Sequence, residues 1–193
     1  MKRSLILTLS VFLLLAVPPN AFSASVQEVI DGRTLKLSDG QTVLLIGVET
    51  ADPADMTRNK RAAERLGVSA GRFALYGEKT KPFLEKLILG KAVRLTYDPQ
   101  NAGTGHRDKE GKTPAYMHED DGVSDLFVVF AKLAGGLYYD KGPGGLNYLS
   151  VNGTLIKSGY AAADKLFSYE HRDVYTKLEE NAKRQKRGMW GFF

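Results

Sequence analysis

Short runs of alternating hydrophobic and polar positions fill the first part of the chain beyond residue 25, a pattern typical of β-strands. Residues 26–30 and 34–37 each alternate in this way. Asp39-Gly40 then predicts a hairpin turn, because both residues tolerate the positive φ angles of such a turn. The apolar run 42–48 predicts a third strand that is covered on both faces. Three short strands joined by tight turns indicate a small barrel.

Later parts of the chain carry both helical and strand patterns. Residues 51–77 show no clear period and predict a long surface loop with at most one helical turn. A helical stripe begins at Thr80 and ends at Gly90, with Pro82 in its first turn, where the missing N–H does no harm. Beyond this helix we expect strands over 91–97 and 114–118 and, after an insert, helices over 151–156 and 170–187.

The insert, residues 119–146, has a pattern that leaves its structure open. An apolar run over 126–133 is followed by a glycine-rich segment, so a β-hairpin and a short helix with a loop both fit. Aromatic and glycine residues suit a contact loop, and we therefore predict a protein partner that binds through this insert. A structural elaboration of the barrel is the alternative.

Composition narrows the chemistry that the chain can carry. The 193 residues include three histidines and no cysteine, which excludes a disulfide scaffold, a thiol nucleophile and a cysteine-ligated metal. Carboxylate, hydroxyl and basic side chains remain as candidates. The formal net charge of +5 permits a polyanionic partner without requiring one.

The N-terminus has the pattern of a secretory signal peptide. Lys2-Arg3 precedes the apolar run 5–17, and Ala21 and Ser23 are small residues suited to signal peptidase. We therefore expect residues 1–23 to be removed by cleavage after Ser23, leaving a secreted or periplasmic domain over 24–193. An uncleaved membrane anchor is the alternative, although the apolar run is short for a span. No stretch after residue 23 is apolar for long enough to cross a membrane.

Four stretches, in the same order along the chain, resemble the thermonuclease family, which has the staphylococcal-nuclease-like fold. They are VIDGRT at 29–34, VETAD at 48–52, GHRDKEGKTPAY at 105–116, and a last stretch from Val151-Asn152 to Gly188-Met189-Trp190. The corresponding family patterns are V-I/V-D-G-D-T, V-D-T-P-E, D-K/R-Y-G-R-x-L-A-Y, and V-N-x-x-L-V-x-x-G-x-A with a closing G-x-W. The resemblance implies a five-stranded OB-fold barrel with about three helices packed against it.

The same resemblance implies cleavage of DNA and RNA phosphodiesters with one calcium ion, but several site positions differ. The family's metal-binding positions correspond to Asp31, Glu49 and Thr50, although Asp31 could serve only to shape its turn. Arg33 stands where the family has a metal-binding carboxylate, so a fixed positive charge replaces a ligand. Asp52 replaces the water-orienting glutamate and is one methylene shorter; a misplacement of about 1 Å can cost about a hundredfold in rate.

The positions that contact phosphate also differ. Leu44 replaces the first family arginine, and Lys112 replaces the second, which keeps the charge but loses the planar guanidinium fork. Substrate contacts are predicted at Lys109, in the nucleotide-contacting loop, at Phe167, near the family's base-side aromatic, and at Arg33, which would supply the missing positive charge.

Together these substitutions favour the loss of efficient family chemistry. We expect an exported, catalytically impaired module that binds nucleic acid or a protein partner. The alternative is a slow calcium-dependent endonuclease, for which calcium would be the cofactor; the impaired module would need none. The basic run 58–65 is expected to be a solvent-exposed face, with a polyanion footprint as the alternative.

Overall fold

The computed structural model describes residues 24–191, without the side chains at 130–134 and 143. The predicted signal peptide, residues 1–23, lies outside this range, so cleavage and export stay predictions. Among the described residues, no helix combines the length and the hydropathy that crossing a membrane requires.

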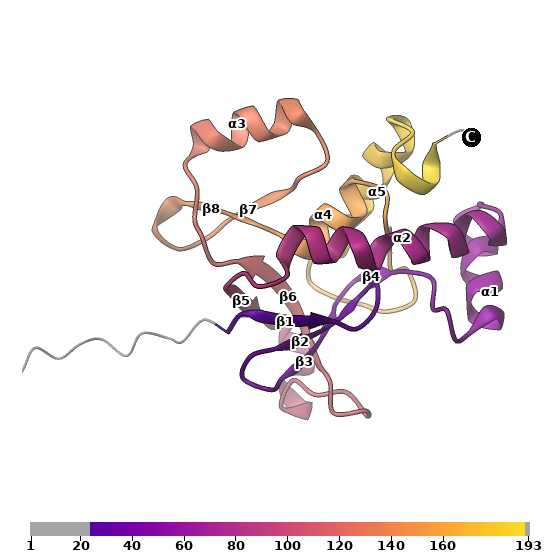
Figure 1. Cartoon of the computed structure of the whole chain (residues 1–193), viewed down its shortest axis with the longest axis horizontal. Coiled ribbons are helices and arrows are strands. Elements are labelled where there is room, and N and C mark those ends of the chain that lie inside the picture. Colours follow the sequence, from indigo (N-terminus) through magenta and orange to yellow (C-terminus); the bar gives the residue numbers. More distant parts are fainter. Residues whose placement is uncertain (1–23, 192–193) are drawn as a thin grey trace, which may run out of the picture.

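A five-stranded mixed sheet forms the centre of the molecule (Figure 1). In spatial order its strands are β1 (Val26–Val29), β2 (Thr34–Leu37), β3 (Thr42–Leu45), β6 (Thr113–Glu119) and β5 (Val93–Thr96). Neighbours are antiparallel except for the parallel pair of β3 and β6. The edge strands β1 and β5 approach each other through a bridge between Ser25 and Ala92, not through a continuous ladder. The sheet therefore curls into a barrel that is incompletely closed.

Two smaller strand pairs and the helices surround this sheet. β4 (Val48–Glu49) pairs with β9 (Ala162–Ala163), and β7 (Tyr139–Lys141) pairs with β8 (Asn147–Leu149). The α-helices are α1 (Met56–Leu66), α2 (Ala70–Ile88), α3 (Asp125–Ala134), α4 (Val151–Lys157) and α5 (Arg172–Arg184). Short 3-10 helices are η1 (Pro99–Thr104), η2 (Pro143–Gly145) and η3 (Gly188–Trp190).

The main core lies between the sheet and the helices α2, α4 and α5 (Figure 1). Leu35 from the sheet, Leu84 from α2 and Leu155 from α4 are all fully buried in it. Asn152 ties α4 to the sheet, because its side-chain oxygen accepts from Met117 N at 2.9 Å and its side-chain nitrogen donates to Ile46 O at 3.0 Å. The V-N pair of the last motif is therefore a structural link at the centre of the fold.

The apolar run 42–48 is divided between two strands, and its prediction as one strand is wrong. Gly47 has a φ of 72°, and a Cβ atom there would lie 2.5 Å from the Tyr169 ring, so only glycine fits this turn. β3 ends before it in the barrel sheet, whereas β4 continues beyond it and pairs with β9. This change of partner carries Glu49 away from the barrel sheet and next to α1.

The prediction of a long surface loop over 51–77 is also wrong, because α1 and the first half of α2 occupy it. The buried face of α1 consists mostly of small and polar residues, since Asn59, Ala62 and Ala63 lie there beside a single large apolar residue, Leu66. α1 nevertheless has clear ends: the Asp55 side chain accepts from Arg58 N at 2.8 Å, and Gly67 closes the helix in the left-handed region.

α2 begins at Ala70, ten residues before the predicted start at Thr80, so Pro82 lies inside the helix and not in its first turn. Gly77 and Thr80 occupy buried positions of its inner face and interrupt the apolar stripe. A Cβ atom at Gly77 would lie 2.5 Å from Ala51 Cβ. The glycine therefore allows α2 to pack closely on the segment that follows β4.

Both structures that the sequence of the insert left open are present, since α3 is followed by β7, which forms a hairpin with β8 just beyond the insert. In Figure 1, α3 stands apart from the other helices. Leu126, Phe127 and Val129 are exposed on it. Binding of a protein partner through 119–146 stays a prediction.

Candidate functional site

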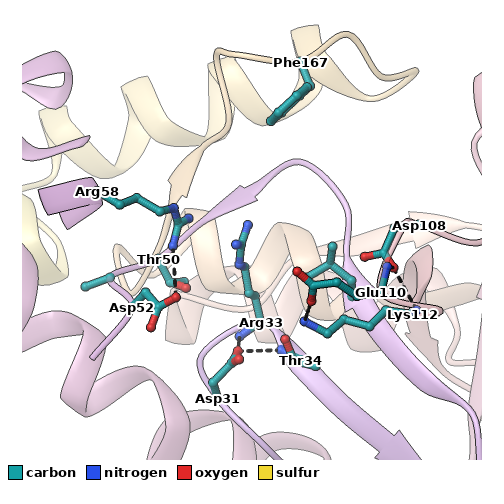
Figure 2. A pocket seen from close by; sticks show the side chains of 12 residues that line it. Asp31, Arg33, Thr34, Thr50, Asp52, Arg58, Asp108, Glu110, Lys112 and Phe167 are labelled. Atoms are coloured by element: carbon teal, nitrogen blue, oxygen red, sulfur yellow. Dashed lines mark hydrogen bonds and ion pairs between the residues drawn. The ribbon is translucent and has the colours of Figure 1, made fainter. Parts of the chain in front are cut away.

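A hollow of about 360 Å³ opens beside the barrel, between the turn after β1, the segment after β4, the start of α1 and the loop before β6 (Figure 2). We call it the central pocket. It is lined by Asp31, Arg33, Thr34, Leu44, Thr50, Ala51, Asp52, Arg58, Asp108, Glu110, Lys112 and Phe167. Most of these side chains are charged, which indicates a site for an ionic ligand.

The central pocket gathers most of the residues predicted from the motifs. Asp31, Arg33, Thr50, Asp52, Lys112 and Phe167 all line it, as does Leu44. Glu49 lines an adjoining hollow instead, and Lys109 is exposed on the loop outside the pocket. The motifs thus lead to one place in the fold, and the role of each residue there stays a prediction.

Asp31 shapes the turn between β1 and β2. One of its carboxylate oxygens accepts hydrogen bonds from both Arg33 N and Thr34 N, each at 2.8 Å. This arrangement fixes the backbone of the turn and so directs the Arg33 side chain toward the pocket. The structural role of Asp31 therefore uses one of its two oxygens.

Glu49 is held between two arginines. Its carboxylate is almost fully buried, and it accepts from Arg58 at 2.7 Å through one oxygen and from Arg65 at 3.2 Å through the other. Arg58 also lies 3.8 Å from a carboxylate oxygen of Asp52. Glu49 thus joins β4 to α1 by two charge-assisted hydrogen bonds.

Asp52 is positioned by Asn59 of α1. Asp52 N donates to the Asn59 side-chain oxygen at 2.7 Å, and the Asn59 amide donates back to Asp52 O at 2.7 Å. One carboxylate oxygen of Asp52 accepts from Ala54 N at 2.9 Å. Its side chain is 43% exposed, and it faces the pocket beside Arg58 (Figure 2).

Lys112 is paired with Glu110 at the opposite wall of the pocket. The two side chains lie 2.6 Å apart, and the hydrogen bond to Glu110 raises the pKa of Lys112. Asp108 fixes this loop by accepting from Glu110 N at 2.9 Å and Lys112 N at 2.8 Å. The lysine is therefore charged, with a partner that is 70% exposed to solvent.

Arg33 projects from the turn before β2 into the middle of the pocket, with the Phe167 ring across the hollow from it (Figure 2). Burial and the neighbouring Arg58 lower the pKa of Arg33, but an arginine side chain remains charged. Among the described residues, no acceptor lies within hydrogen-bonding or ion-pairing distance of its guanidinium. Its donors are thus available to a ligand.

The calcium ion that the resemblance implies does not fit this donor set. Calcium takes six to eight oxygen ligands. Asp31 has one oxygen engaged by backbone amides, Glu49 has both engaged by arginines, and the Arg33 guanidinium enters the same space. Within residues 24–191, no group of three or more histidine, aspartate or glutamate side chains could hold a metal ion.

Arg58 is one of the site residues that the motifs do not predict; Asp108 and Glu110 are others. Arg58 belongs to the basic run that the sequence predicts to be solvent-exposed, because its pattern predicts a loop where α1 lies. The residues Arg58, Arg61 and Arg65 are three and four positions apart, which places them on one face of a helix. This spacing was the signal in the sequence that could have identified them.

Comparison with known proteins agrees with the fold. The sequence model of a family described as "Staphylococcal nuclease homologue" matches residues 42–191, and a search of curated proteins found no match to the chain. The match begins in β3 and continues through η3, so it includes Thr50, Asp52 and Lys112. It confirms the predicted fold of an OB-type barrel with helices, although the barrel is incompletely closed. The chain therefore belongs to the staphylococcal nuclease homologue family.

Proposed function

We propose that this domain binds a strand of nucleic acid at the central pocket without calcium, as a catalytically impaired member of its family. The observation that supports this most is the unpaired Arg33 guanidinium, which faces the pocket opposite Phe167. A guanidinium can hold a phosphate through two parallel hydrogen bonds. An exposed aromatic ring can stack on an unpaired base.

Impaired hydrolysis is part of this proposal. The carboxylate of Asp52 lies 3.8 Å from Arg58, which holds it at the rim of the pocket. Leu44 lines the pocket where a phosphate-binding arginine is expected and offers no donor. Lys112 offers a single charged group in place of a planar fork, so the bidentate grip that stabilises charge in a transition state is absent at this position.

Ligand binding requires limited rearrangement of the pocket. The pair of Lys112 and Glu110 is partly exposed and therefore contributes little to stability, so a phosphate can replace Glu110 as the partner of Lys112. Arg33 needs no rearrangement, because its guanidinium has no partner to leave. We therefore assign the phosphate nearest the barrel to Arg33, with Lys112 and Arg58 on either side of it.

The test is fluorescence anisotropy of a labelled 12-mer oligothymidylate with residues 24–193, in EDTA and in calcium. We expect binding of equal affinity in both buffers. Arg33→Ala should weaken it about 10- to 100-fold, since a hydrogen bond to a charged group contributes about 1.5–3 kcal/mol. Lys36→Ala is the matched control, because Lys36 is exposed on β2, three residues after Arg33, and does not line the pocket.

Two results would overturn this proposal. Absence of binding in either buffer would remove the pocket as a nucleic-acid site. Calcium-dependent cleavage of the oligonucleotide, lost in Asp52→Ala, would instead establish the alternative of a slow endonuclease. That alternative has support in the pocket, since Thr50 and Asp52 both line it.

A further inference from the structure

A second hollow of about 370 Å³ adjoins the central pocket on the side of α1. The two hollows share Arg33, Arg58 and Phe167 as lining residues, so they form a continuous depression around these side chains. Arg61 and Arg65 of α1 line only the second hollow. We call it the α1 groove.

α1 presents its arginines to this groove from one face. Arg58, Arg61 and Arg65 follow one another at spacings of three and four residues, so their side chains project in the same direction. The neighbouring face packs into a second hydrophobic cluster with Ala62 and Ala63, which are almost fully buried. The helix is therefore fixed to the body of the protein while its basic face remains at the surface.

The charge of the α1 groove differs from that of the central pocket. Four carboxylates and three cationic side chains line the central pocket, whereas four arginines and two carboxylates line the groove. Both carboxylates of the groove are buried and engaged: Glu49 accepts from Arg58 and Arg65, and Asp164 accepts from Leu166 N at 2.7 Å. Carboxylates therefore outnumber cationic side chains by one in the central pocket, whereas arginines outnumber carboxylates by two in the groove, so the attraction for phosphate is greater in the groove.

The arginines of the groove keep donors for a ligand. A guanidinium has five N–H groups, and the bonds to Glu49 use one N–H of Arg58 and one of Arg65. Among the described residues, Arg61 has no hydrogen-bond or ion-pair partner. Glu49 thus orients two guanidinium groups without saturating them, which lowers the entropy cost of binding a phosphate.

The groove also has an apolar rim. Leu166 and Phe167 are 58% and 68% exposed, and both line the groove. Positive charge beside exposed apolar side chains suits a ligand that carries phosphates and flat, unpaired bases. A duplex stacks its bases inside and would leave these two side chains without contact.

We propose that the α1 groove is a second phosphate-binding subsite, which rests on the proposed function of the central pocket. A single strand of DNA or RNA extends from Lys112 past Arg33 to the basic face of α1. Arg61 and Arg65 bind phosphates beyond the one at Arg33, and Leu166 and Phe167 contact the intervening bases. The protein therefore binds long strands more tightly than short ones, because only long strands reach the arginines of α1.

The test measures affinity for oligothymidylates of two to twelve nucleotides, by competition with the labelled 12-mer, over a series of salt concentrations. For the 12-mer we expect Arg61→Ala to weaken binding about tenfold and to reduce the salt slope by about 0.7, the value for one phosphate contact to a single strand. Affinity for the dinucleotide should not change. Arg61→Lys should retain the salt slope, and Lys60→Ala, on the same helix but outside both hollows, should leave both quantities unchanged.

The outcomes separate this proposal from the function of the central pocket. If Arg33→Ala weakens binding at every length and Arg61→Ala at none, the groove is not a subsite and the pocket function stands. If neither the 12-mer nor the dinucleotide binds the wild-type protein, both proposals fail. If a 12-base-pair duplex competes as well as the single strand, binding in the groove depends on charge alone. The assignment of bases to Leu166 and Phe167 is then overturned.

Discussion

Replacing Glu49 by glutamine tests whether this carboxylate holds α1 against β4. The change Glu49→Gln keeps the size of the side chain and removes its charge. It breaks one of the two hydrogen bonds, at 2.7 and 3.2 Å, and weakens the other, because the amide has a single acceptor oxygen.

The expected cost follows from these two bonds. A hydrogen bond to a charged group contributes about 1.5–3 kcal/mol, and the lower end applies here because the Arg58 and Arg65 side chains are 27% and 38% exposed. Repulsion between the two arginines, no longer neutralised, adds to the loss. We expect the free energy of unfolding to fall by about 2–3 kcal/mol, which lowers the Tm by about 5–10 °C in a domain of this size.

The assay is thermal and urea unfolding followed by circular dichroism, with and without calcium. Glu119→Gln is the matched control, because Glu119 pairs with Lys91 at 2.8 Å and that lysine is 43% exposed. Its loss should cost less than about 1 kcal/mol. Equal effects of the two variants would refute the reasoning. So would a calcium-induced rise in Tm that Glu49→Gln abolishes, since Glu49 would then be a metal ligand.

Three further predictions follow from the fold. Burial raises the pKa of Asp98, but hydrogen bonds from a tyrosine hydroxyl and two backbone amides outweigh it and lower the pKa below 3.8. The ionised Asp98 carboxylate therefore stabilises the fold above that pH, and this stabilisation is lost as the pH falls further. Asp98→Asn should lower the free energy of unfolding by about 1–3 kcal/mol at neutral pH and make stability depend less on pH in acid. Gly77→Ala should destabilise by about 1–3 kcal/mol in urea, because its Cβ would lie 2.5 Å from Ala51, whereas Gly71→Ala on the same helix meets open space and should not. N-terminal sequencing of the exported protein should begin directly after Ser23; an intact N-terminus would show an uncleaved anchor.

Some strands of the barrel could be predicted because a strand with one buried face produces a period of two in the sequence. In β2, for example, Leu35 and Leu37 are buried and Lys36 between them is exposed. α1 could not be found in this way. Its buried face carries small residues and Asn59, whose hydrogen bonds join α1 to Asp52, and Leu66 is its single large apolar residue.

Only those parts of the candidate site that are fixed by local motifs could be predicted from the sequence. The turn of Asp31 and the loop of Lys112 are each fixed by neighbouring residues, so their motifs specify them. The contact between Glu49 and Arg58 depends instead on where α1 packs. Single positions in the sequence gave no sign that a presumed metal ligand is engaged by arginines.

The turn at Gly47 has a consequence for the order in which the protein folds. It transfers the chain from the barrel sheet to β4, whose partner β9 lies more than a hundred residues later in the sequence. During synthesis from the N-terminus, the first three strands can pair as soon as they leave the ribosome. β4 can pair with β9 only after the last part of the chain has been synthesised. Long-range closure of this kind is slow. A fragment that ends before β9 would therefore lack the partner strand of Glu49, the residue that orients Arg58 and Arg65. The α1 groove would be the last part of the binding surface to form.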